Sequence, residues 1–503
     1  MRFIIHRALL CMCLVSYFSF AQDEPEEKPP VPEAKTSVTS HSIKINGKKL
    51  SYTATAGTML MKNAKQEPIA LFGYTAYVKE DTSLRKRPIL FAYNGGPGSA
   101  SLWLHMGILG PKRAVVKDVE FANNGPYGYV VNEFTILDKA DIVMIDPVGT
   151  GFSRPVGEGK GEDFWGTDQD IRSVSAFIKQ YITENNRWQS PKFILGESYG
   201  GMRTAGVAQA LTNEMISLNG IMLVSPFLQF VNGFDFGQTD LPHVLFLPTF
   251  AATGWYHDAI DNKPATLAEH LKAAEAFAVD EYAPALLKGV RLSADKKKAL
   301  AEKLAALTGL EAQYWLEADL RVNHQVFTKE VLSESAQTVG RIDSRFKGNT
   351  LSVHSEAMSY DPMTTAIGPP LLAAFMDYYR TELKSEQEVD YKVFGDVFSS
   401  WDWGHVQPNV GFKMPFPDTL IDLSYAMIQN PKMKVLFQQG YYDLATPHFT
   451  TQYMIDHLKI PAALRSNIST AYYEAGHMMY VHEPSMAQFK ADLATFIDAS
   501  LPN

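Results

Sequence analysis

Short, nearly unbroken runs of apolar residues recur along the chain from residue 88 onward. They occupy residues 89–93, 142–145, 193–195, 221–224 and 435–437. Strands of a parallel sheet that is covered on both faces show this pattern, because neither side of the strand meets water. Between the second and third runs, residues 168–181 repeat apolar side chains at helical spacing. This order predicts a strand, a crossover helix and a second parallel strand.

Two segments ahead of this region alternate apolar with polar residues instead. Residues 42–56 and 69–79 follow a period of two, which predicts antiparallel strands with one buried face. Asn46-Gly47 lies within the first segment, and this pair favours a hairpin turn. Near the other end of the chain, we expect a strand at 469–473 and a final helix with one apolar face.

The segment 231–375 interrupts the regular succession of buried strands. It holds long helical runs, and no convincing buried strand follows before residue 435. We therefore predict an α/β fold with a central, mostly parallel sheet and helices on both faces, built from residues 38–230 and 376–503. The segment 231–375 is predicted as a mostly helical cap. Residues 22–37, which are rich in proline and glutamate, are predicted as a disordered tether.

Composition fits a globular protein and narrows the choice of partners. The 503 residues are 46% hydrophobic and 20% charged, with a formal net charge of −9. Binding to nucleic acid needs a cluster of basic residues that releases counterions from the phosphates. The acidic chain supplies no such cluster, so we expect no nucleic-acid partner.

The first 21 residues have the layout of a secretory signal peptide. Arg2 and Arg7 precede an apolar run at 8–20, and small residues stand before a predicted cut after Ala21. An N-terminal membrane anchor is the alternative, since a cysteine can take a lipid. Both cysteines lie in this segment, so the mature chain would contain no thiol. No other apolar stretch nears the roughly 18 residues of a membrane helix, and we expect a periplasmic or secreted protein with no membrane contact after cleavage.

Residues 196–200 form a G-x-S-x-G element between an apolar strand and a helix-compatible run. This layout holds the serine on a tight turn that lifts its hydroxyl clear of the sheet, and the glycines let neighbouring backbone approach. The motif alone is weak, and a glycine-rich turn without chemistry is the alternative. The strand before it and the helix after it favour Ser198 as a nucleophile.

A serine nucleophile needs a base to take its proton, and the base needs an acid to hold its tautomer. Asp443 follows an apolar strand, and His477 follows the next strand and precedes the last helix. Catalytic groups gather at the carboxyl ends of parallel strands, so we predict Ser198, Asp443 and His477 as a catalytic triad. His482 and His448 are competitors for the base, although the first leads into the final helix and the second lies very close to Asp443 in sequence.

The glycine-rich segment 94–98, NGGPG, directly follows the first buried strand. Acyl transfer places negative charge on a carbonyl oxygen, which backbone N–H donors stabilise. We predict that the amides of Gly96 and of Tyr199, the residue after Ser198, form this oxyanion hole. A phosphate-binding loop is the alternative, but the usual glycine patterns are absent and Pro97 has no N–H.

Together these elements resemble the serine carboxypeptidase family of α/β-hydrolases, in its bacterial-type branch without disulfides. NGGPGSASL at 94–102 is similar to the family's NGGPGCSSL loop, and GESYGG at 196–201 is similar to its GESYAG. DPVGTGFS at 146–153 resembles its D-x-P-V-G-T-G-F-S element, while GYYD and AGHM near the C-terminus match its GDxD and AGHM. The resemblance covers about 85–230 and 430–485.

The resemblance implies an α/β-hydrolase fold and a secreted serine-type carboxypeptidase, which cleaves C-terminal peptide bonds through an acyl-enzyme on Ser198. It implies the same triad and oxyanion donors, and peptide or protein C-termini as substrates. An acyltransferase or esterase with the same triad is the alternative, and a catalytically silent binding protein is a third reading. No cofactor and no metal is expected, because the chain has no HExxH or other spaced ligand cluster.

In this family an Asn of the glycine loop, the Glu before the nucleophile and a second Glu bind the substrate's C-terminal carboxylate. Asn94 and Glu197 match the first two, but Ile108 stands where the second Glu falls, and Ala92 and Ser99 replace a Trp and a Cys. The resemblance therefore implies carboxylate binding by Asn94 and Glu197 in a weakened clamp. In such a clamp one carboxyl must be protonated to hydrogen-bond another carboxylate.

Two further segments keep two interpretations each. Residues 341–345, RIDSR, could present a guanidinium to an anionic substrate group, but we favour a solvated turn. Residues 401–405, WDWGH, either line the substrate channel or pack in the interior. His105, near the glycine loop, is predicted to be structural.

Overall fold

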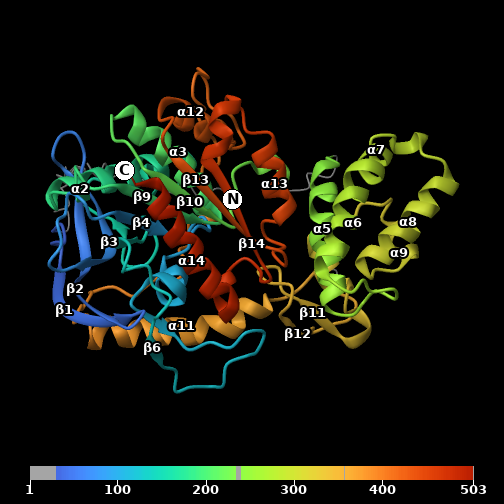
Figure 1. Cartoon of the computed structure of the whole chain (residues 1–503), viewed down its shortest axis with the longest axis horizontal. Helices are drawn as coiled ribbons and strands as arrows, with labels where there is room; N and C mark the ends of the chain where they lie inside the picture. The colour runs from blue at the N-terminus through green and yellow to red at the C-terminus, as the bar shows by residue number, and fades with distance from the viewer. Residues whose placement is uncertain (1–29, 234–238, 356, 502–503) are drawn as a thin grey trace, which may run out of the picture.

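The computed structural model of the protein describes residues 30–233, 239–355 and 357–501, so the predicted signal peptide at 1–21 lies outside the described residues. Within these ranges the centre is a ten-stranded sheet with the order β1-β2-β3-β7-β4-β9-β10-β13-β14, and β8 pairs with β3 (Figure 1). Its strands are β1 (Thr36–Ile45), β2 (Lys48–Lys62), β3 (Pro68–Lys79), β4 (Ile89–Tyr93), β7 (Asp141–Ile145), β8 (Arg154–Pro155), β9 (Lys192–Glu197), β10 (Gly220–Val224), β13 (Lys434–Gly440) and β14 (Ile468–Tyr473). Neighbours from β7 to β14 are parallel, and neighbours from β1 to β7 are antiparallel.

The antiparallel end of the sheet begins with a hairpin between β1 and β2. Asn46 and Gly47 form its turn with φ values of 47° and 77°, which is the left-handed conformation that an Asn-Gly hairpin turn needs. β1 already begins at Thr36. Thr36 and Ser37, which end the tether predicted at 22–37, are therefore part of the sheet, because they pair with β2.

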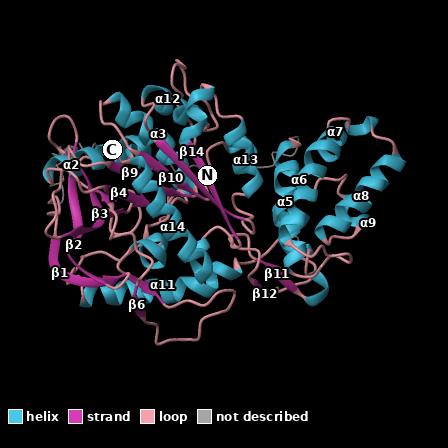
Figure 2. Ribbon diagram, in the orientation of Figure 1, coloured by secondary structure: helices cyan, strands magenta, loops and turns pink. Residues whose placement is uncertain are grey.

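Helices cover both faces of the sheet (Figure 2). One face carries α2 (Thr167–Glu184), α3 (Tyr199–Asn213), α12 (Leu420–Gln429) and α13 (His448–Asp456), and the other carries α1 (Leu102–Leu104), α11 (Pro362–Thr381) and α14 (Glu483–Ser500). Side chains of β4 alternate between the two cores, with Leu90 and Ala92 on the α11 face and Ile89, Phe91 and Tyr93 on the α2 face. The strand is apolar at every position because each of its faces is buried.

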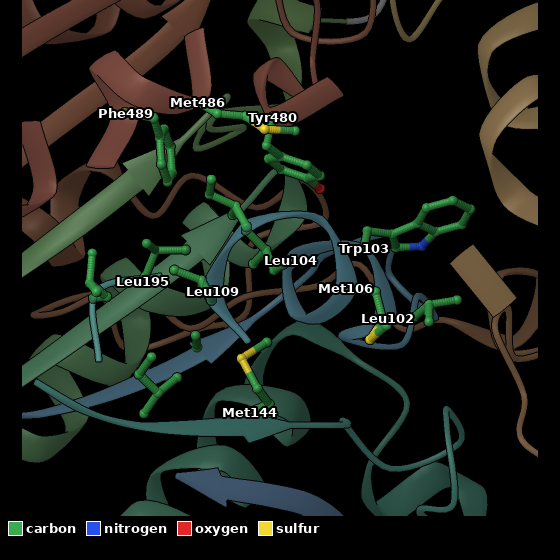
Figure 3. Close-up of a cluster of buried hydrophobic side chains, with 14 of the residues drawn as sticks. Leu102, Trp103, Leu104, Met106, Leu109, Met144, Leu195, Tyr480, Met486 and Phe489 are labelled. Carbon is green, nitrogen blue, oxygen red and sulfur yellow. The ribbon is translucent and has the colours of Figure 1, made fainter. Parts of the chain in front are cut away.

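The core under α11 and α14 holds the segment that follows the glycine loop (Figure 3). α1 and the π-helix His105–Leu109 are buried throughout. Their side chains share this core with residues of β7, β9 and α14, namely Leu102, Trp103, Leu104, Met106, Leu109, Met144, Leu195, Met486 and Phe489. The glycine loop is thus anchored on a fully packed helical turn.

The insertion forms a bundle of helices beside the sheet (Figure 1). Its helices are α4 (Phe230–Gly233), α5 (Leu241–Tyr256), α6 (Leu267–Phe277), α7 (Ala283–Leu286), α8 (Ala294–Thr308), α9 (Ala312–Glu317) and α10 (His324–Glu330), and two short strands follow, β11 (Gln337–Val339) and β12 (Lys347–Asn349). Helices α5 to α10 share a separate hydrophobic core. The boundary predicted at residue 375 is wrong, because it falls inside α11, which packs on the sheet.

A small antiparallel pair, β5 (Lys112–Ala114) and β6 (Tyr129–Val131), lies outside the main sheet. None of the helices in the described ranges combines the length and the apolar character that crossing a bilayer requires.

Candidate active site

Ser198 occupies the sharp turn between β9 and α3. Its backbone has φ 63° and ψ −127°, a strained conformation that exposes a nucleophile at the end of a strand. The Ser198 amide donates to the carbonyl of Val224 at 2.9 Å, which ties the turn to β10. Gly196 is required here, because a Cβ at this position would lie 2.2 Å from the carbonyl oxygen of Gly200.

Asp443 and His477 are brought together at the ends of β13 and β14. The Asp443 carboxylate is fully buried, and its Oδ2 accepts a hydrogen bond from His477 Nδ1 at 2.7 Å. Five donors lie within hydrogen-bonding distance of this carboxylate, namely the amides of Ala445 and Thr446, the Thr446 hydroxyl, Gln439 Nε2 and His477 Nδ1. The Asp443 contact places the ring proton on Nδ1 and leaves Nε2 of His477 as the basic nitrogen.

The position of His477 relative to Ser198 follows from β10. Ser225, which follows the β10 residue bonded to the Ser198 amide, donates its hydroxyl to the carbonyl of His477 at 2.8 Å. Among the described residues no hydrogen bond joins the Ser198 hydroxyl to the His477 ring. Burial disfavours the charged ring, but the attraction of Asp443 outweighs burial and raises the pKa of His477.

The two competing histidines have other partners. His482 Nδ1 contacts the Ser485 hydroxyl at 2.8 Å at the start of α14. His448 contacts Thr249 at 3.2 Å and Glu275 at 3.2 Å in the insertion. Neither ring contacts Asp443, so the structure favours His477 as the partner of that carboxylate.

The glycine loop lies directly against the turn of Ser198. A Cβ on Gly95 would lie 2.5 Å from the Tyr199 nitrogen, so only glycine permits this approach. Gly96 has φ 106°. In the described structure the amides of Gly96 and Tyr199 donate to no other group. Two unpaired N–H groups beside a serine hydroxyl are what an oxyanion hole requires.

A buried arginine is hydrogen-bonded to the backbone of this loop. Arg203 of α3 is fully buried and donates from Nη1 to the carbonyl of Asn94 at 2.8 Å. Its charge is balanced by Asp170 of α2 at 2.6 Å. The guanidinium also lies over the rings of Tyr93 and Tyr199, at 4.9 and 5.4 Å. One side chain therefore links the loop, the nucleophile helix and the crossover helix.

Asn94 and Glu197, the residues that the resemblance implies for carboxylate binding, contact each other next to Ser198. Asn94 Nδ2 donates to Glu197 Oε1 at 2.8 Å. Tyr480 donates its hydroxyl to the same oxygen at 3.1 Å. Glu197 Oε2 is buried and has no hydrogen-bond partner among the described residues. Burial raises the pKa of Glu197 to about 7, so this carboxyl exchanges its proton near neutral pH.

Sequence reasoning missed Tyr480. The residue lies in the short 3₁₀ helix Met479–Val481, three positions after His477. Its ring packs on Gly107, where a Cβ would lie 2.4 Å from Tyr480 Cδ2. The proximity to His477 in sequence is the one local signal for it, and its contact with Glu197 is visible only in the fold.

Ile108, which stands where the family has a second Glu, supplies no polar group. Its side chain is 1% exposed and belongs to the core under the glycine loop. Ala92 of β4 is buried in the same core. Ser99 accepts a hydrogen bond from Trp103 Nε1 at 3.0 Å. The residues at these three positions therefore make contacts inside the protein: Ile108 and Ala92 pack in the core, and Ser99 forms a hydrogen bond.

The solvated turn that we favoured at 341–345 is wrong. Asp343, Ser344 and Arg345 are buried, and the Arg345 guanidinium binds Asp343 at 2.7 Å and Asp118 at 2.9 Å. Burial becomes possible because the two carboxylates neutralise the guanidinium. Four of the five guanidinium N–H groups of Arg345 donate to these two carboxylates, whereas Arg341 at the start of the segment is exposed.

The segment 401–405 makes the interior contacts that one of its two interpretations predicts. Trp401 and Trp403 pack edge-on against Tyr199 at ring distances of 5.5 and 6.0 Å. His405 is buried between Asp168 and Asp422, at 2.6 and 2.9 Å. Burial alone would lower the pKa of His405, but the two carboxylates raise it to about 9.

His105 makes structural contacts, as predicted. Its Nε2 contacts the Tyr77 hydroxyl at 2.6 Å inside the core. Burial lowers the pKa of His105 to about 3, so the ring is neutral.

Comparison with known proteins adds a family and a fold. The sequence model of the family described as serine carboxypeptidase matches residues 49–489. Over 218 residues the chain is 24% identical to serine carboxypeptidase-like 45 of Arabidopsis thaliana, covering 40% of this chain and 43% of that protein. Over 224 residues it is 25% identical to the vitellogenic carboxypeptidase of Aedes aegypti, covering 42% and 43%. The chain thus aligns with less than half the length of these relatives.

One solved structure has the same overall fold. It is a prohormone-processing carboxypeptidase from Saccharomyces cerevisiae, with a TM-score of 0.54 over 89% of this chain and 92% of that chain. Sequence identity in this superposition is 13%, so the likeness concerns the fold alone. The predicted α/β-hydrolase fold, with its mostly parallel sheet and helices on both faces, is confirmed.

Proposed function

The chain belongs to the serine carboxypeptidase family, a family of serine hydrolases, and from this premise we propose that it hydrolyses the C-terminal peptide bond of peptides or proteins. The reaction proceeds through an acyl-enzyme on Ser198. The observation that carries this proposal is a pairing of two sites. The Asp443–His477 contact of 2.7 Å lies beside the buried Asn94–Glu197 contact of 2.8 Å. The first pair activates a serine, and the second recognises a carboxylate.

In the proposed reaction, Nε2 of His477 removes the proton of Ser198 as its oxygen attacks the scissile carbonyl carbon. The amides of Gly96 and Tyr199 stabilise the charge that forms on the carbonyl oxygen, each contributing about 3 kcal/mol. His477 then gives its proton to the leaving amine. A water molecule repeats the sequence and releases the acyl group, which restores the Ser198 hydroxyl.

Recognition of the free C-terminus depends on a proton held by Glu197. The Oε1 atom of Glu197 accepts hydrogen bonds from Asn94 and Tyr480, while Oε2 is buried and has no partner within the described ranges. A protonated Glu197 can donate from Oε2 to a substrate carboxylate, whereas an ionised Glu197 repels it. With its pKa raised to about 7 by burial, the carboxyl is in the binding form below neutral pH.

The proposal is tested with a blocked dipeptide that has a free C-terminal carboxylate and with the same peptide amidated. We expect release of a C-terminal amino acid from the free acid only. The variant Ser198→Ala serves as the control and should release none. Equal or faster reaction of the amide, or of a simple ester, would show that the carboxylate clamp does not select the substrate.

We further propose that residues 1–21 direct export of the protein, so that the enzyme acts outside the cytoplasm. The basic start, the apolar run and the small residues before Ala21 support this. N-terminal sequencing of the protein recovered outside the producing cells should then begin at Gln22. Recovery of an uncleaved or lipid-modified N-terminus would contradict it.

A further inference from the structure

Residues 341–345, which we call the bracket, connect the helical insertion to the two loops that carry Asp443 and His477. The carbonyl of Arg341 accepts a hydrogen bond from the Leu444 amide at 3.1 Å. The carbonyl of Ile342 accepts one from the His477 amide at 2.7 Å. Two successive carbonyls of the bracket thus bind both catalytic loops.

The next two residues of the bracket extend these contacts. Asp343 Oδ2 accepts a hydrogen bond from the Gly476 amide at 2.9 Å. The Ser344 amide donates to the carbonyl of Tyr442 at 2.9 Å. A Cβ on Gly476 would lie 2.4 Å from Asp343 Cβ, so Asp343 fills the space next to the residue that precedes His477. The backbone on both sides of the Asp443–His477 contact is therefore held by one short segment.

The bracket is itself fixed by buried charges. Arg345 binds the buried Asp343 at 2.7 Å and the partly exposed Asp118 at 2.9 Å. Asp361, which caps α11, accepts the Arg341 amide at 2.8 Å. Asp343 is 0% exposed and Arg345 is 5% exposed. Buried networks whose members are all paired are rigid, because no other arrangement satisfies their charges.

We propose that Asp343 is a positioning residue that sets the geometry of His477 against Asp443, so that the insertion completes the catalytic pair. This rests on the proposed function, in which His477 is the general base. Small displacements of a base lower the rate strongly even when substrate binding is intact. The titratable and charged groups that face the His477 ring are Asp443, Glu197 and Arg341, and the bracket determines how closely the ring meets the first of them.

The variant Asp343→Asn tests this with little change in shape. In the protein, Oδ1 of Asp343 accepts the Arg345 amide and Nε, and Oδ2 accepts Gly476 and Arg345 Nη2. An asparagine has one oxygen, so its NH₂ group must face one of these donors. Gly476→Ala provides an independent second variant, because its methyl group pushes the loop away from an unchanged Asp343.

Asp141→Asn is the matched control. Asp141 is also 0% exposed and accepts a backbone amide, that of Lys79, together with Arg87 and Arg187. It stands at the first residue of β7, at the end of the sheet opposite the catalytic loops. Its loss should lower stability to a similar degree without touching His477.

The measurement is kcat and KM of the full chain for the free-acid dipeptide across pH, per site labelled by a fluorophosphonate. We expect Asp343→Asn and Gly476→Ala to lower kcat about tenfold with little change in KM. Weaker contact with Asp443 lowers the pKa of His477, so the acid limb of kcat/KM should move to lower pH. In Asp141→Asn, fewer molecules are folded, but kcat per labelled site and the acid limb stay as in the parent.

Unchanged kcat and an unchanged acid limb in both bracket variants would overturn the proposal. A readout without substrate separates it from the proposed function. The Nδ1 proton of His477, shared with Asp443, gives a far-downfield proton NMR signal, which we expect to move upfield or broaden in Asp343→Asn. If the parent neither hydrolyses peptides nor labels at Ser198, the proposed function fails, while this signal still tests the bracket.

Discussion

The two carboxylates of the active site, Asp443 and Glu197, are both buried, yet their surroundings differ. Five donors lie around Asp443, and both of its oxygens are engaged. Among the residues that the structure describes, Glu197 has two donors, both on Oε1, and its second oxygen is unpaired. A carboxylate whose two oxygens both accept hydrogen bonds can only orient its neighbours, whereas a carboxyl group with an unpaired oxygen can bind a ligand. In the proposed function, this difference separates the catalytic half of the site from the half that recognises the substrate carboxylate.

Removing the charge of Asp443 should have the largest effect on activity. In Asp443→Asn an NH₂ group faces Nδ1 of His477 and favours the wrong tautomer of the ring. We expect kcat to fall about 10⁴-fold with KM nearly unchanged. The rate is measured per folded molecule, with circular dichroism as the control for folding. A loss below tenfold would show that His477 does not depend on this carboxylate.

The pH dependence of substrate binding should distinguish the two halves. Because burial raises the pKa of Glu197 to about 7, its proton is present below that pH and is lost above it. We expect kcat/KM for the free-acid peptide to fall about fiftyfold between pH 7 and 9, because about half of Glu197 is protonated at pH 7 and about one per cent at pH 9. Glu197→Gln always carries a donor, so its profile should be flat there. The same alkaline limb in the variant would assign it to another group.

The pH dependence of the free energy of unfolding should reveal the titration of Glu197 without any substrate. The folded pKa of Glu197 lies above the usual 4.5, so its contribution to stability is present at low pH and is lost as pH rises toward 7. We expect the free energy of unfolding of the parent to drop by about 2 kcal/mol relative to Glu197→Gln between pH 5 and 7. Guanidinium titrations of both proteins at the two pH values measure this. A constant difference would mean that Glu197 titrates alike in both states.

The smallest effect is expected at Tyr480. Its hydroxyl hydrogen-bonds Glu197 Oε1 and thereby lowers the pKa of that carboxyl. Tyr480→Phe should move the alkaline limb to higher pH and raise kcat/KM at neutral pH by at most about twofold, because a larger fraction of Glu197 is then protonated. Steady-state kinetics on the free-acid peptide test this. A limb that moves to lower pH would contradict the role given to the hydroxyl.

Much of the sheet could be predicted because its signals are local. β4 lies where an unbroken apolar run predicted it, and the Asn46-Gly47 pair forms the turn of the first hairpin. Asp443 and His477 could be selected as candidates for a similar reason, since Asp443 follows an apolar strand and His477 follows the strand expected at 469–473. The parallel arrangement of those strands then brings the two side chains to one edge.

The rest depends on contacts between distant segments. Tyr480 meets Glu197 across 283 positions of sequence, and Asp343 meets Gly476 across 133. Neither contact leaves a periodic pattern. Charged residues such as those of 341–345 look solvated until their partners are known, because burial of an arginine depends on the carboxylates around it. Most of α11 falls within the predicted insertion, although the helix packs on the sheet. Helical spacing identifies a helix but does not show which surface it packs on.

The strand order gives Ser198 and His477, the proposed nucleophile and base, unequal protection against local unfolding. Ser198 follows β9, which is enclosed between β4 and β10, whereas His477 follows β14, the last strand of the sheet. Edge strands open more readily than central ones, and their amides exchange hydrogen sooner. Mild heating should therefore inactivate the enzyme reversibly, because β14 unfolds locally and displaces His477 while β9, the strand before Ser198, is still folded. Heat inactivation would then precede melting, and cooling would restore activity.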